Sequence, residues 1–196
     1  MANKPARERI RQQRRSRRTR SLLVWGGSGV GLVVLIIVLV WPRAQPSQGV
    51  AVPVMDSAAH VEPGTDPGPY NSDPPTSGRH YAEPLPSGFY EEDEVAQLGD
   101  YPEGRLVHSL EHGYVIFWYN CERVDPDECD QLKQDIRQVM DDAGSLKVIA
   151  FPWSSIGEPV VMTSWGQMLR MQRFDSDSAA QFIRINRNRA PEPQAP

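Results

Sequence analysis

Two histidines stand four residues apart, at His108 and His112. In a helix this spacing places both imidazoles on one face, about 6 Å apart along the axis. In a strand they would lie about 13 Å apart, which is too far to share an ion. Neutral imidazoles are common ligands of zinc and copper(II). The pair therefore predicts a metal site if residues 106–112 form a short helix or tight turn, which Gly113 would end.

A third histidine, His80, follows the segment Pro74–Gly78, in which two prolines stiffen the chain and Thr-Ser-Gly favours a turn. A rigid turn can place a single ligand on an otherwise irregular segment. We therefore predict a copper or zinc site as the cofactor site of this chain. Its predicted ligands are His80, His108 and His112, with His60 as a weaker fourth candidate and Glu111 orienting an imidazole through its second nitrogen.

Two alternatives stay open for the histidine cluster. In the first, the histidines and Glu111 form a buried polar network in a structural or interaction module that binds no metal. In the second, His108-Ser-Leu-Glu-His112 matches the H-x-x-E-H pattern of zinc peptidases, in which the glutamate activates water. That hydrolase is the least favoured hypothesis, because the helix would be short and no third ligand is identifiable downstream. The sequence favours a role without catalysis.

Cys121 and Cys129 are the two cysteines of the chain. Cys121 follows the best strand pattern, and Cys129 lies in the first turns of the next helix pattern. In an oxidising compartment such a pair favours a structural disulfide, which would stabilise the fold by about 2.5 kcal/mol in the loop-entropy model. A metal pair or a free reactive thiol are the alternatives.

The charge is divided very unevenly along the chain. It holds 21 basic and 25 acidic residues for a net charge of −4, yet residues 1–20 carry nine basic residues and one acidic residue. The uncharged span Leu22–Trp41 is long enough for a helix that crosses a bilayer. The basic flank predicts a cytoplasmic N-terminus. We therefore expect an uncleaved single-pass membrane anchor, with the C-terminal domain outside the cytoplasm.

The acidic remainder of the chain argues against a nucleic-acid partner. Gly27 and Gly31 form a pair of small residues at the spacing that lets membrane helices pack closely, so a homodimer through them is an alternative to a monomer. The segments predicted by composition are a basic cytoplasmic arm at 1–21, a transmembrane helix at 22–41, a Pro/Gly/Ser/Gln-rich stalk at 42–59, an extracytoplasmic domain at 60–190 and a flexible tail at 191–196.

The elements that must position these residues become regular only after Leu106. Apolar runs and helical periodicity predict four strands and two helices. Their expected ranges are strands at 114–119, 147–151, 160–163 and 167–171, and helices from Pro126 to Gly144 and from Ser176 to Arg189. Asp125 and Glu128 suggest a capping box, and Asp175 or Ser176 a cap. The expected fold is α+β, a small mixed sheet of about four strands with two helices. A thioredoxin-like order is conceivable, but no Cys-x-x-Cys supports its redox chemistry.

Two long motifs carry a family resemblance. They are Pro74-Pro-Thr-Ser-Gly78-x-His80-Tyr81, with Gly88-x-Tyr90 after it, and Val107-His-Ser-Leu-Glu-His-Gly-x-Val115. With them the chain resembles, over about residues 61–189, the bacterial membrane-anchored family catalogued as domain of unknown function 3105. The resemblance implies a bacterial cell-membrane location, an N-terminal anchor and an extracytoplasmic domain. It brings no established activity.

Overall fold

The computed structural model describes residues 49–195, which belong to a compact unit spanning Ser47–Pro196. The basic arm, the apolar span with Gly27 and Gly31, and the first part of the predicted stalk, residues 42–48, lie outside the described residues. Among residues 49–195, no helix combines the length and the apolar character that crossing a bilayer requires.

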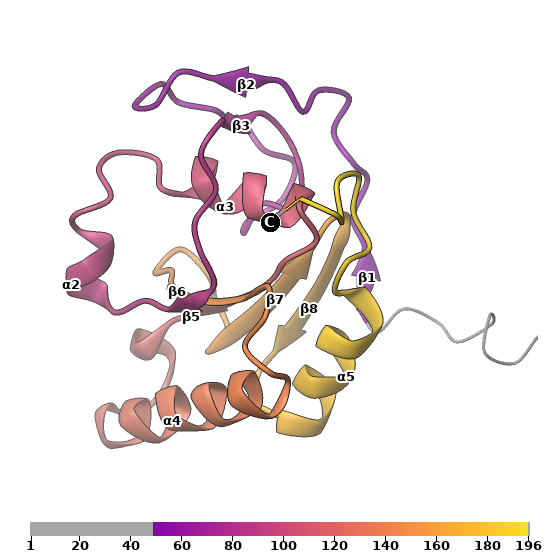
Figure 1. Ribbon diagram of the computed structural model, residues 1–196. Helices are drawn as coiled ribbons and strands as arrows, with labels where there is room; N and C mark the ends of the chain where they lie inside the picture. The colour runs from indigo at the N-terminus through magenta and orange to yellow at the C-terminus, as the bar shows by residue number, and fades with distance from the viewer. Residues whose placement is uncertain (1–48, 196) are drawn as a thin grey trace, which may run out of the picture. The chain divides into compact units, whose positions relative to one another are not determined.

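A six-stranded mixed sheet forms the centre of the domain (Figure 1). Its strands, in spatial order, are β1 (Val50–Ala51), β8 (Gln167–Met171), β7 (Val160–Ser164), β5 (Val115–Tyr119), β6 (Val148–Pro152) and β4 (Gly88–Phe89). The strands β4, β5 and β6 are parallel, whereas β7 runs antiparallel to β5, β8 to β7 and β1 to β8. All five residues of β5 are buried, which confirms the predicted central strand.

The expectation of about four strands was wrong, because the sheet has six. The four predicted strands are present, and the two additional ones, β1 and β4, are edge strands of two residues each. A segment this short shows no periodicity, so only pairing with a neighbour reveals it. Strand β1 also lies within the segment whose composition predicts a stalk, and Val50 of β1 pairs with Met168 of β8.

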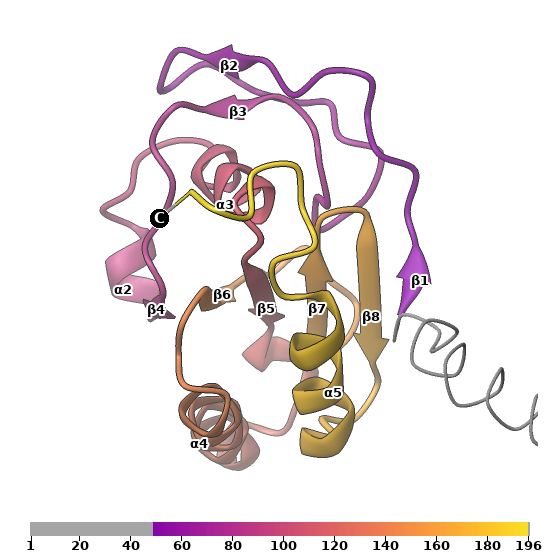
Figure 2. The same cartoon turned by 45° about the vertical axis from the view of Figure 1, so that its right-hand side comes forward.

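Two amphipathic helices, α4 (Pro126–Asp142) and α5 (Ser176–Asn186), cover one face of the sheet (Figure 2). Their buried side chains, which include Ile136 and Phe182, pack with Val115, Phe117 and Met162 of the sheet in one apolar cluster. The helix α5 begins as predicted, because the Asp175 carboxylate accepts a hydrogen bond from the Ser178 amide.

The predicted capping box at the start of α4 was wrong. Asp125 is the N-cap residue, but its side chain makes no capping hydrogen bond. Instead the Glu128 amide donates to the backbone carbonyl of Asp125 at 2.8 Å. Pro126 at the first helical position already supplies the backbone conformation that begins the helix.

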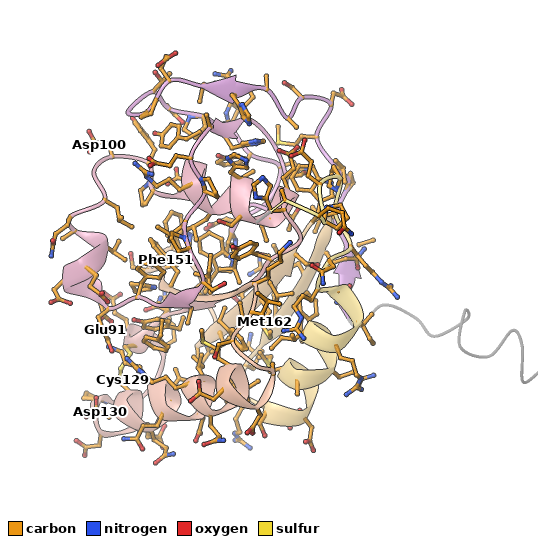
Figure 3. The ribbon with its side chains drawn as sticks, viewed as in Figure 1. Glu91, Asp100, Cys129, Asp130, Phe151 and Met162 are labelled. Carbon is orange, nitrogen blue, oxygen red and sulfur yellow. A yellow bond between two sulfur atoms is a disulfide. The ribbon has the colours of Figure 1, made fainter. Side chains whose placement is uncertain are left out.

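The opposite face of the sheet is covered by α3 (Glu103–Glu111). Leu106 and Leu110 of α3 pack on Ile116, Trp118 and Phe151 in a second apolar cluster. Figure 3 labels one residue of each cluster, Phe151 on the α3 side and Met162 on the α4 and α5 side. The metal prediction required a short helix or tight turn before Gly113, and α3 is such a helix.

Gly113 has a φ of +86°, and a Cβ there would lie 2.7 Å from the Cα atom of Asn188. Glycine is therefore required both by the backbone conformation and by the close approach of the chain. Besides α3, the described residues contain two further short helices that the sequence pattern did not predict: α2 (Glu92–Val95) and the 3₁₀ helix η2 (Cys121–Arg123).

A two-stranded parallel ribbon, β2 (His60–Val61) and β3 (His80–Tyr81), lies beyond α3 from the sheet (Figures 1 and 2). The ring of Tyr81 lies directly on Gly104 of α3, where an added Cβ would come within 3.0 Å of that ring. The irregular segment Pro74–Gly78, which precedes β3, is buried. Close packing at Gly104 thus fixes the ribbon over the outer side of α3.

The predicted disulfide is present between Cys121 and Cys129. It joins the beginning of η2 to the first turns of α4, at the end of the molecule where Figure 3 labels Cys129. It lies on the face of the sheet that α4 covers, away from the ribbon of β2 and β3.

Candidate metal centre

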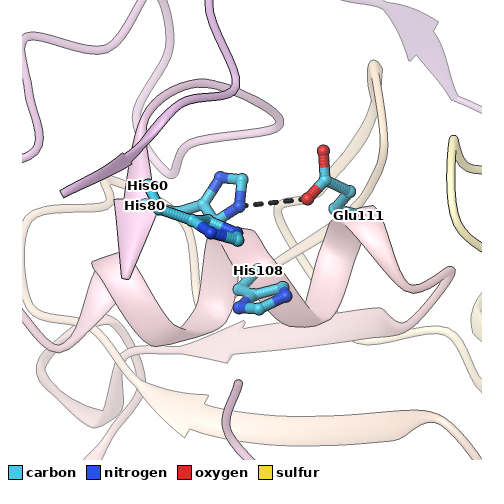
Figure 4. Close-up of side chains that lie close together, drawn as sticks. All are labelled: His60, His80, His108 and Glu111. Atoms are coloured by element: carbon cyan, nitrogen blue, oxygen red, sulfur yellow. Dashed lines mark ion pairs between the residues drawn. The ribbon is translucent and has the colours of Figure 1, made fainter. Parts of the chain in front are cut away.

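Four side chains from three elements converge between the ribbon and α3 (Figure 4). Each offers one ligand atom, and these atoms all lie within 4.8 Å of one another. The four residues are His60, His80, His108 and Glu111. The register of β2 and β3 sets His60 beside His80. One helical turn separates His108 from Glu111, so both lie on the same side of α3.

The three imidazole rings form a nearly equilateral triangle. The ring centroids of His60 and His80 are 4.9 Å apart, those of His60 and His108 5.0 Å, and those of His80 and His108 4.9 Å. Around one tetrahedral ion with metal–nitrogen distances of about 2.0–2.1 Å, neighbouring ring centroids lie roughly 5 Å apart. The triangle therefore has the dimensions of a three-imidazole site.

Backbone carbonyls fix the protonation of the two buried rings. Nδ1 of His80 lies 2.8 Å from the carbonyl oxygen of Gly78, and Nδ1 of His108 lies 2.8 Å from that of Tyr81. A carbonyl only accepts, so each Nδ1 carries the hydrogen and donates it. The Nε2 atom of each neutral ring is then left with a lone pair, which is the arrangement that orients histidine ligands in metal sites.

The Nε2 atom of His80 faces the carboxylate of Glu111. It lies 3.0 Å from Oε2, at ion-pair distance, as the dashed line in Figure 4 shows. The approach does not have hydrogen-bond geometry, so this fully buried nitrogen has no hydrogen-bond partner. An unsatisfied buried nitrogen beside a carboxylate oxygen is a costly arrangement for a site that stays empty.

Burial also sets the charges of the site. It lowers the pKa of His80 below its ordinary value. Burial and the neighbouring His112 and His80 lower the pKa of His108 to about 4. Burial and the nearby Glu192 carboxylate raise the pKa of Glu111. The buried imidazoles are therefore neutral at pH 7, which is the form that binds metal.

The placement of the predicted ligands differs from one residue to the next. His80 and His108 lie in the group, together with His60, which the sequence marked more weakly. Glu111, which we predicted to orient a ligand, lies in the group itself. His112 is not one of the four, although its ring centroid is 4.4 Å from that of His108. Its Nε2 atom lies 3.7 Å from the Glu192 carboxylate.

Two residues near the site carried no sequence signal, Lys147 and Glu192. The buried ammonium of Lys147 donates to the carbonyl oxygens of His112, Pro193 and Ala195 at 2.8–2.9 Å. The Glu192 amide donates to the carbonyl oxygen of Glu111 at 3.0 Å. The segment 191–195, whose composition suggests a flexible tail, is thereby joined to the C-terminal end of α3.

The group of four consists of three histidines and one glutamate. Met162 and Met171 are buried in the cluster under α4 and α5, and Met168 in the cluster under α3. The donors offered by the group are therefore imidazole nitrogens and carboxylate oxygens.

The chain belongs to a family of proteins of unknown function, DUF3105. The family model matches residues 60–196, which is more than half of the chain and includes all four converging residues. A search of the curated proteins and a search of the solved structures found no match.

Proposed function

We propose that this protein is a membrane-anchored, extracytoplasmic metal-binding protein that holds one divalent zinc or copper ion. The ligands are His60, Nε2 of His80, Nε2 of His108 and the carboxylate of Glu111. Three imidazoles with one carboxylate suit zinc or copper(II), whereas copper(I) prefers the sulfur donors that this group lacks.

The observation that carries the proposal is the contact between Nε2 of His80 and Oε2 of Glu111 at 3.0 Å. With the His80 hydrogen held on Nδ1, two lone pairs face each other in a buried site. Protonating the ring would relieve this repulsion, but burial opposes that charge. A cation bound between the two groups relieves the repulsion without charging the ring.

One alternative follows from the raised pKa of Glu111. A protonated Glu111 carboxyl group could donate to His80, and the cluster would then be a neutral polar network that fastens the ribbon to α3. Such a network would need no metal. The zinc hydrolase hypothesis has less support, because its pattern needs His112 as a ligand and leaves Glu111 free to activate water.

The location outside the cytoplasm rests on the basic arm, on the uncharged span Leu22–Trp41 and on the disulfide, which suits an oxidising compartment. Protease added to spheroplasts should digest the C-terminal domain and leave a protected fragment that holds the N-terminal arm. A mature chain that begins between Ala44 and Val52 would contradict the anchor. Dimerisation through Gly27 and Gly31 stays a separate proposal, tested by cross-linking the membrane-embedded chain.

The metal proposal is tested by titrating the purified full-length chain with Zn²⁺ or Cu²⁺ and measuring bound metal after desalting. The test variant is His80→Asn, whose amide can still donate to Gly78 but cannot replace Nε2. The matched control is His112→Asn, because His112 is a buried neighbour of His108 that lies outside the group of four.

We expect one bound ion in the native chain and in His112→Asn, and none in His80→Asn, with circular dichroism showing that all three are folded. A native chain that binds no metal contradicts the proposal and favours the polar network. If both variants lost the metal equally, His112 would be a ligand. It would then take the place of Glu111 or His60 in the proposed set.

A further inference from the structure

The four converging residues differ sharply in their exposure. The side chains of the group on β3 and α3 are buried, with exposed fractions of 0% for His80, 5% for His108 and 8% for Glu111. His60 on β2 is exposed. The centre therefore has a buried inner part with three ligands and an outer part with one.

The two inner rings cannot rotate freely, and the backbone of Glu111 is held in place. Nδ1 hydrogen bonds to the carbonyl oxygens of Gly78 and Tyr81 fix both buried rings. Glu111 is in the last turn of α3, whose next residues are joined to segment 188–195 by the bonds from Asn188 to Gly113 and from Glu192 to Glu111. These three ligands form a preorganised half-site.

His60 lies on an exposed strap, which we define as residues 56–66. All its residues are exposed except the half-buried Val61. Close to its two ends, the Met55 amide donates to Oγ of Ser77, and the Tyr81 hydroxyl donates to the carbonyl oxygen of Thr65. Between them, β2 is attached through its two-residue pairing with β3 and the bond from the His80 amide to Ala59. A segment with so little buried surface opens at low free-energy cost.

Any adjustment of the ligands around an ion has to come from the part of the centre that is not fixed. Ligand nitrogens around a tetrahedral ion lie roughly 3.3 Å apart, whereas the atoms of this group lie within 4.8 Å of one another. Hydrogen bonds hold the two buried rings, so the exposed strap is the part that can adjust to an ion.

From this division we infer that His60 is the exchangeable ligand of the centre. An ion is first held by His80, His108 and Glu111, and His60 closes over it from the strap. When the strap opens, one coordination position faces solvent, and a competing ligand from another molecule can enter there and remove the ion. The protein would then be able to pass its metal on by ligand exchange. This inference rests on the proposed metal-binding function.

The test uses Zn²⁺ and the full-length chain in three forms: native, His60→Ala and Glu62→Gln. Glu62 is the matched control, because it is an exposed residue of the same strap and lies outside the group of four. Two quantities are measured: the rate at which an excess of a small chelator removes Zn²⁺, and hydrogen exchange of the strap amides with and without Zn²⁺.

We expect the native chain and Glu62→Gln to bind one ion with the same release rate. We expect His60→Ala to bind one ion as well, but to release it at least about tenfold faster, since one bond to the metal is missing. Zn²⁺ should slow exchange of amides 57–62 in the native chain and leave it unchanged in His60→Ala.

Three results would overturn the inference while the proposed function survives. The first is a His60→Ala release rate within twofold of native, which would mean that His60 does not bind the ion. The second is complete loss of binding in His60→Ala, which would mean that the inner three ligands are not a half-site. The third is unchanged strap exchange on adding Zn²⁺. A native chain that binds no Zn²⁺ would contradict both the inference and the proposed function.

Discussion

The two faces of the central sheet are both buried, but by different kinds of structure. On one face, α4 and α5 cover an apolar cluster and present their polar sides to solvent. On the other, α3 is enclosed on both sides. Leu106 and Leu110 contact the sheet, while His108 and Glu111 are buried beneath the ribbon of β2 and β3.

Within this one small domain, one face of the sheet serves mainly stability and the other carries the candidate metal centre. The face of α4 and α5 is an ordinary core with a disulfide at its edge, and no metal-ligand group among the described residues lies there. The outer side of α3 buries polar groups whose free-energy cost has to be offset by hydrogen bonds or by a ligand. A second buried layer over a helix is thus what makes a desolvated site possible here.

The largest expected effect comes from truncating one core residue on each face. Phe182→Ala on the α5 side should lower the free energy of unfolding by about 3–5 kcal/mol, and Leu110→Ala on the α3 side by about 2–5 kcal/mol, since both side chains are fully buried. Denaturant unfolding of the metal-free chain measures both losses.

Zinc affinity then distinguishes the two faces. Leu110 precedes Glu111 on α3, so Leu110→Ala should weaken Zn²⁺ binding, whereas Phe182→Ala should leave it within about twofold of native. Equal weakening by both variants would mean that the centre depends on the whole fold and not on its own face.

Acidification should act on the α3 face through His108. The pKa of His108 is lowered to about 4 by burial, so the unfolded chain binds the proton more readily than the folded one. This group leaves stability unchanged above about pH 6.5 and lowers it progressively as the pH falls from about 6.5 to about 4, by roughly 2–3 kcal/mol in total. His108→Gln should flatten this part of the stability curve, which urea unfolding of metal-free protein between pH 4 and 7 would measure.

Reduction of the disulfide should act on the other face. Opening the Cys121–Cys129 link, which closes a loop with a sequence separation of 8, should cost about 2.5 kcal/mol by loop entropy. Thermal unfolding with and without reductant measures the loss. Zn²⁺ stoichiometry should stay at its native value, and a centre that empties on reduction would show that the two faces are coupled.

The sequence by itself determined much of the face that α4 and α5 cover. The helical periods of residues 126–142 and 176–186 and the apolar run at Val115–Tyr119 are local patterns, so they predicted the helices and the central strands closely. For the segment that carries His108, local spacing set only a condition, a short helix or tight turn at 106–112 if a metal binds, and α3 meets it. The sequence did not predict the edge strands of two residues or the missing capping bond at Asp125, because a short pattern does not encode pairing partners or side-chain geometry.

Only the tertiary structure decided which side chains form the centre. The residues at i+3 and i+4 from His108 are both on its side of the helix, and sequence spacing favoured His112 over Glu111 as a ligand. The ribbon decides between Glu111 and His112. Its register sets His60 beside His80, and Nε2 of His80 lies against Glu111. A pairing between segments 20 residues apart depends on how an irregular, proline-rich chain packs on Gly104, and no local pattern records that contact.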